Sequence, residues 1–174
     1  TMVLPVAAFS TLGWFDDPLL TNLLKHDDVS LADVVLHELA HQTYYAPGHA
    51  AFNESFASFV GARGAIEFFS QLDGDDAPRT QLARARWHDE LLYSEFLGGL
   101  MERLREAYAS GIDLEQREAL FRQEQAAFAT LPWRTDDFRA LGTVRLNNAL
   151  LLHQWVYHDD LAAFESTCEE QDLD

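Results

Sequence analysis

Two histidines and a glutamate in one short segment have the types and spacing that bind and use a metal ion. The segment His37-Glu38-Leu39-Ala40-His41 has the pattern HExxH. Residues four apart lie on one face of a helix, so the imidazoles of His37 and His41 could hold one ion together. Glu38 is rotated to the side, where its carboxylate could take a proton from a water molecule. The segment therefore predicts metal-assisted hydrolysis.

A catalytic zinc ion needs a third protein ligand and one open position. Glu54 lies near the start of the next predicted helix, and a helix, a tight turn and a returning helix would bring it toward the two histidines. His49, in the turn, is the alternative. Three-His zinc sites place their third histidine about six residues after the second, and His49 does not have this spacing. The pattern favours His37, His41 and Glu54 as ligands of Zn²⁺.

The helix that must carry the histidines is predicted over residues 31–45 by its apolar spacing. Ser30, followed three residues later by Asp33, resembles a capping box at its start. Pro47 and Gly48 predict the turn after it.

The helix that must carry Glu54 is predicted from residue 51 to about residue 72, with a loop at residues 73–78. Gly61 and Gly64 lie inside this helix, and small residues there would let another helix approach closely or allow some bending.

The rest of the chain predicts a mainly α-helical domain. Further helices are expected at residues 81–109, 114–131 and 160–170, and the first two should form an antiparallel pair packed against the metal-binding helices. An apolar helix should begin near Asn147 and Asn148, one of which could cap it while the other binds something. Residues 3–9 are predicted to form a short edge strand. His88 is expected to be a surface or core residue.

Length and charge limit the function. A chain of 174 residues predicts a single domain over residues 1–174. With 29 acidic and 12 basic residues the formal charge is −17, which argues against nucleic acid as a partner. No apolar run reaches the length of a membrane span. Cys168 is the only cysteine, so no internal disulfide can form.

Several segments together resemble a known family. They are Ser10–Phe15 with Asp17 and Pro18, His37–Gln42, Phe52–Ala57 with Val60 and Gly61, and Leu146–Ala149 with Tyr157. In their order and spacing these residues resemble the bacterial predicted-aminopeptidase family of zinc peptidases. The resemblance implies a zincin-like helical metallopeptidase domain of the gluzincin type. It also implies His37, His41 and Glu54 as ligands and Glu38 as the base.

The chain departs from that family in two ways. Family members have a substantial region upstream with an envelope-targeting terminus, so we expect this chain to be the carboxy-terminal part, with most of the sheet missing. The resemblance then implies the cell envelope or periplasm for a full-length form, and the cytoplasm if the chain is complete. Gluzincins also place an Asp four residues after the third ligand, where this chain has Ser58. The carboxylate that orients a histidine would then come from Asp17, Asp33 or Asp159.

The predicted activity is zinc-dependent hydrolysis of peptides, of the aminopeptidase type. Tyr157 is expected by resemblance to stabilise the negative charge on the substrate oxygen, with Tyr44, Tyr45 and His153 as alternatives. Asn147 and Asn148 would hold the substrate backbone or brace a metal ligand. Two alternatives remain: a zinc-binding module without catalysis, and a zinc amidase acting on cell-wall peptides.

Overall fold

The computed structural model describes residues 25–139 and 141–170, and these residues form helices joined by turns and loops. The helices are α1 (Asp28–Thr43), α2 (Ala50–Asp73), α3 (Pro78–Ala109), α4 (Leu114–Ala129), the 3-10 turn η2 (Leu141–Thr143), α5 (Asn148–His158) and α6 (Leu161–Glu170). The prediction of a mainly helical chain is thus confirmed, whereas the strand predicted at residues 3–9 lies outside the described residues. No helix in the described ranges is both long and apolar enough to cross a membrane.

Helix α1 begins earlier than predicted because Asp27 caps it. The Asp27 carboxylate accepts two hydrogen bonds of 3.1 Å from backbone N–H groups of the first turn. Arg86 on α3 holds the same carboxylate through contacts of 2.7 and 2.8 Å. The predicted capping box of Ser30 and Asp33 is therefore wrong, since Ser30 lies inside the first turn and donates its own hydroxyl to Asp27.

Helices α1 and α2 form an antiparallel pair with a close approach at two glycines of α2. A Cβ atom on Gly61 would lie 2.7 Å from the carbonyl oxygen of Asp33, and one on Gly64 would lie 2.9 Å from Cδ1 of Leu36. Helix α2 runs without interruption through both positions. The prediction that these small residues admit a neighbouring helix is confirmed, and that neighbour is the helix of the HExxH segment.

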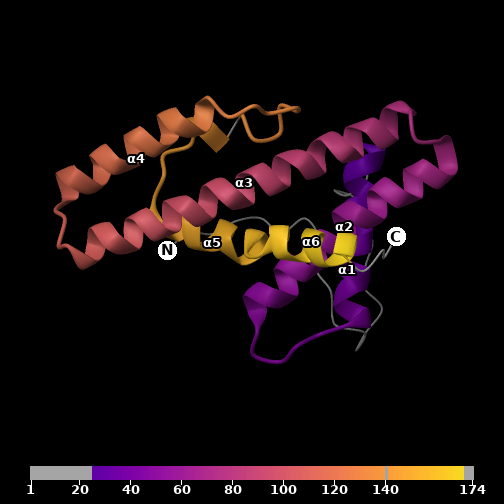
Figure 1. Ribbon diagram of the computed structural model, residues 1–174, viewed down its shortest axis with the longest axis horizontal. Coiled ribbons are helices and arrows are strands. Elements are labelled where there is room, and N and C mark those ends of the chain that lie inside the picture. Colours follow the sequence, from indigo (N-terminus) through magenta and orange to yellow (C-terminus); the bar gives the residue numbers. More distant parts are fainter. Residues whose placement is uncertain (1–24, 140, 171–174) are drawn as a thin grey trace.

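Helix α3 is the long helix on which the other elements gather (Figure 1). It starts with Pro78 at its first position, where the missing N–H of proline is harmless, and it ends before Gly111, whose φ is 79°. One half of α3 shares a core with α1, α2 and α6. The buried residues of this core are Val29, Ile66, Phe69, Ala83, Trp87 and Leu161.

Helix α4 packs along the other half of α3 and against η2. Asp113 and Gln116 form a capping box at its start. Figure 1 shows α4 and α1 near opposite ends of α3, so the expectation that α4 also packs against the metal-binding helices is wrong. The second core, which α4 covers, contains Tyr93, Leu97, Leu100, Leu104, Phe121, Phe128 and Leu151.

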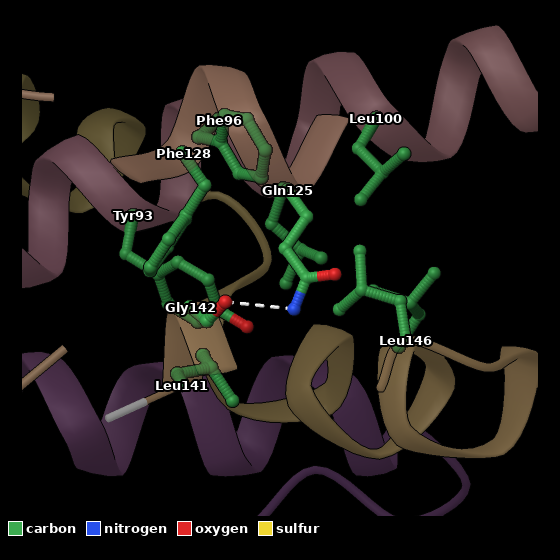
Figure 2. A pocket seen from close by; sticks show the side chains of 10 residues that line it. Tyr93, Phe96, Leu100, Gln125, Phe128, Leu141, Gly142 and Leu146 are labelled. Atoms are coloured by element: carbon green, nitrogen blue, oxygen red, sulfur yellow. Dashed lines mark hydrogen bonds between the residues drawn. The ribbon is translucent and has the colours of Figure 1, made fainter. Parts of the chain in front are cut away.

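A small hollow lies within this second core (Figure 2). Gln125 is one of the residues that line it, and its Nε2 donates to the carbonyl oxygens of Gly142 at 2.7 Å and Val144 at 2.9 Å. The cavity volume is about 20 Å³, which is room for about one water molecule. This hollow is therefore too small to hold a substrate.

Candidate metal centre

The side chains of His37, His41 and Glu54 converge between α1 and α2. One carboxylate oxygen, Oε2 of Glu54, lies 3.4 Å from Nε2 of His37 and 3.5 Å from Nε2 of His41. The two imidazole rings meet edge to face, with centroids 4.9 Å apart. Potential ligand atoms of the three side chains all lie within 4.8 Å of one another. The two segments predicted to supply ligands are thus brought together by the fold.

The turn between the two helices sets the position of Glu54. Its neighbour Asn53 is buried, and the Asn53 amide makes two hydrogen bonds of 2.8 Å with the backbone N–H and C=O of Ala46. This pair of bonds joins the start of α2 to the chain that leaves α1. His49, at the tip of the turn, is exposed and is not part of the cluster. Nothing in the local sequence marks Asn53 for this role, because an asparagine after a turn has many other uses.

Interactions among the three side chains shift the pKa values of Glu54 and His41. Hydrogen bonds from His37 and His41 lower the pKa of Glu54 to about 2, although partial burial acts in the opposite direction. The hydrogen bond to Glu54 in turn raises the pKa of His41. The carboxylate is therefore ionised at neutral pH, as a metal ligand must be.

This set of donors fits a divalent metal ion. Two imidazole nitrogens and one carboxylate oxygen are a known ligand set for catalytic zinc, which leaves a position free for water or substrate. Here, one carboxylate oxygen already faces both nitrogens, so the donor atoms converge on a common centre. His88, by contrast, lies beside Asp89, with Nδ1 3.0 Å from Oδ1, and is not part of the cluster.

Glu38 and Tyr157 both lie near this cluster. The charge of Glu38 contributes to the raised pKa of His41 and to that of Tyr157. Burial is the main cause of the raised pKa of Tyr157, and the charge of Glu54 adds to it. The ring centroid of Tyr157 is 6.4 Å from that of His37. Because its pKa is raised, the hydroxyl of Tyr157 keeps its proton at neutral pH and remains able to donate a hydrogen bond.

The alternatives to Tyr157 occupy different surroundings. His153 contacts the Tyr157 ring edge to face, with centroids 5.4 Å apart. Tyr44 and Tyr45 follow the end of α1 and are about half exposed. Tyr44 packs against the ring of Phe52, with centroids 6.2 Å apart. Of the four candidates, Tyr157 is the one with a ring contact to a cluster histidine.

Asn147 and Asn148 lie at the other end of α5 from Tyr157. Asn147 caps the helix, since its side-chain oxygen accepts from the N–H of Leu150 at 3.0 Å. Asn148 accepts a hydrogen bond of 2.8 Å from the hydroxyl of Tyr108. The predicted cap is therefore confirmed. Ten residues of helix span about 15 Å, so both asparagines lie well away from the Tyr157 end of α5. A role for either asparagine in holding substrate stays a prediction.

Three acidic residues were expected to orient a histidine. Of the two that the structure describes, Asp33 is the one whose pKa is affected by the charge of a cluster histidine. Burial and the charge of Glu90 raise the pKa of Asp33 to about 7, and the charge of His37 acts against this rise. Burial also raises the pKa of Asp159, without a contribution from either histidine. Asp17 lies outside the described residues.

The sequence matches a known protein family along its whole length. The profile of the family described as "Putative aminopeptidase" matches residues 1–174. No curated protein and no solved structure matches the chain significantly.

Proposed function

The chain belongs to this aminopeptidase family, and from that membership we propose that it is a zinc-dependent peptidase of the aminopeptidase type. The observation that carries the proposal is the convergence of His37, His41 and Glu54 on one centre. In the gluzincin arrangement, two histidines of an HExxH helix and a glutamate of the next helix have this geometry. The substrate would be a peptide.

His37, His41 and Glu54 would hold the metal ion. When bound, zinc polarises a carbonyl group and makes a water molecule more acidic. Glu38 lies one residue after the first histidine, and its charge acts on His41. Its carboxylate takes the proton of the attacking water and later passes that proton to the leaving amine.

Tyr157 stabilises the negative charge that develops on the substrate carbonyl oxygen. Its hydroxyl stays protonated because its pKa is raised by burial and by the charges of Glu54 and Glu38. A donor held beside the reacting centre in partly buried surroundings is worth more than one in water. Loss of one such donor lowers kcat by about 10²- to 10³-fold in other hydrolases.

The decisive experiment compares the wild type with Glu38→Gln. Zinc content is measured after chelation and readdition, and hydrolysis is measured with aminoacyl p-nitroanilides and with internally quenched peptides. We expect both proteins to bind one zinc ion and only the wild type to hydrolyse aminoacyl substrates. Glu115→Gln, an exposed glutamate on α4, is the matched control and should keep full activity.

Three other results would each indicate a different function. Bound zinc without hydrolysis that depends on Glu38 would mean a metal-binding module without catalysis. Cleavage only of peptides with a blocked amino terminus would remove the aminopeptidase assignment and keep the zinc site. Hydrolysis restricted to cell-wall peptides would identify an amidase.

A further inference from the structure

The last turn of α5 is attached to α2 and α3 on both sides of Tyr157. The carbonyl oxygen of Val156 accepts a hydrogen bond of 3.1 Å from Oγ of Ser55 on α2. The carbonyl oxygen of His158 accepts one of 2.6 Å from Oγ of Ser94 on α3. Carbonyl groups in the last turn of a helix have no partner within the helix. The two serine hydroxyls supply the missing donors.

Both serine side chains are buried. Ser55 is 0 % exposed and Ser94 is 8 % exposed. A buried hydroxyl that donates to an otherwise unpaired carbonyl gives a hydrogen bond that water does not replace. The backbone on either side of Tyr157 is therefore fixed by two separate helices.

The His158 ring adds a further attachment to α3. Its Nε2 lies 2.8 Å from Oε2 of Glu90, and its Nδ1 lies 2.7 Å from the carbonyl oxygen of Gln154. The ring also meets the ring of Tyr93 edge to face, with centroids 4.7 Å apart. The residue that follows Tyr157 is thus held in one orientation.

Ser55 connects this attachment to the metal centre, because it directly follows Glu54 in α2. One turn of α2 therefore holds both a ligand of the cluster and the donor that fixes the carbonyl next to Tyr157. The side chain of Tyr157 leaves the backbone between the two attached carbonyls, and its ring lies 6.4 Å from that of His37. The distance between Tyr157 and the cluster is therefore set by short, buried contacts.

The geometry points to Ser55 and Ser94 as positioning residues that hold Tyr157 where its hydroxyl can stabilise the substrate oxygen. This inference rests on the proposed peptidase function. Neither serine touches substrate, and both act through Tyr157. Displacement of a reacting group by about 1 Å can lower a rate about 10²-fold, so small losses of attachment matter.

The test uses the full chain loaded with zinc and an aminoacyl p-nitroanilide as substrate. We expect Ser55→Ala and Ser94→Ala each to lower kcat by about 10-fold or more, with KM within about twofold and zinc content unchanged. Both should also weaken the binding of a phosphinic dipeptide, which imitates the tetrahedral state. Ser110→Ala is the matched control, since its exposed hydroxyl also donates to a backbone carbonyl, that of Ala107. It should leave kcat unchanged.

A double-mutant cycle with Tyr157→Phe separates positioning from general stability. If the serines act through Tyr157, Ser55→Ala has little further effect on kcat once the hydroxyl is gone. The same loss in both backgrounds would overturn the inference while the peptidase function stands. Should Ser55→Ala fail to fold, Ser94→Ala decides by the same comparison, because it lies on another helix. Absence of hydrolysis by the zinc-loaded wild type would instead overturn the proposed function, and this inference with it.

Discussion

Gly61 on α2 lies directly against Asp33 on α1, so that a Cβ atom on the glycine would be 2.4 Å from Oδ1 of Asp33 and 2.7 Å from its carbonyl oxygen. The same Cβ atom would be 3.2 Å from Cβ of His37. This contact therefore sets how near the helix that carries Glu54 comes to the helix that carries the histidines.

Gly61→Ala should force α1 and α2 apart. Overpacking costs about 1–3 kcal/mol, and the better helix propensity of alanine returns about 1 kcal/mol of this. We expect a net loss of up to about 2 kcal/mol in the free energy of unfolding and weaker zinc binding, measured by urea denaturation and by metal titration. In Gly98→Ala the new methyl group meets nothing closer than 3.8 Å, so this control should be neutral or stabilising. Equal stability changes in the two variants would contradict the close approach.

Glu54→Ala should remove most of the stabilisation that zinc gives. A ligand present at about 100 times its Kd stabilises the folded state by about 2.7 kcal/mol. We expect zinc to raise the melting temperature of the wild type and of His49→Ala, but not that of Glu54→Ala. Thermal denaturation with and without a chelator measures this. A zinc response lost in His49→Ala and kept in Glu54→Ala would reverse the ligand assignment.

His158→Gln should be destabilising at low pH more than at high pH. Burial disfavours a charged imidazole, yet the pKa of His158 is raised because Glu90 and the Gln154 carbonyl accept its hydrogen bonds. A raised pKa means that this stabilisation is fully present below the ordinary pKa of about 6.5 and is lost as the pH rises through the folded-state pKa.

Urea denaturation of the wild type and of His158→Gln at about pH 5.5 and about pH 9 checks this prediction. We expect the difference in the free energy of unfolding to be about 1–3 kcal/mol at the lower pH and smaller at the higher pH. His49→Gln, at an exposed position, should show no such dependence. A difference that grows with pH would show that His158 is neutral in the folded protein.

Asp89→Asn should weaken the packing of the segment after α4. The buried Asp89 carboxylate accepts hydrogen bonds from the N–H of Arg134 at 2.9 Å and from the N–H and hydroxyl of Thr135 at 2.8 Å each. An asparagine would turn an NH₂ group toward one of these donors. We expect a loss of about 3 kcal/mol, against about 1 kcal/mol for Thr135→Val, which removes one donor. Similar losses in the two variants would mean that the carboxylate is not the centre of this network.

Much of the fold and of the candidate cluster could be predicted because local sequence determines them. Helical spacing gives two histidines on one face of α1, and the short turn after it brings α2 back, so Glu54 could be named together with His37 and His41. The close approach at Gly61 also followed from residue size.

Other features depend on contacts between distant segments. The start of α1 is determined by Asp27 partly because Arg86, on another helix, holds that carboxylate. Ser55 and Ser94 have no sequence signal, because a serine in a helix gains a partner only when the fold brings a free carbonyl to it. The distance of α4 from the cluster was likewise not predictable from its apolar pattern.

The double hydrogen bond between Asn53 and Ala46 has a consequence for how the protein can change during evolution. It fastens the base of the turn, so the exposed tip at residues 47–49 is not needed to hold the ligands in place. Lengthening a loop costs little, about 0.6 kcal/mol for each doubling. Insertions at this tip could therefore change the exposed surface of the protein while the arrangement of His37, His41 and Glu54 is kept.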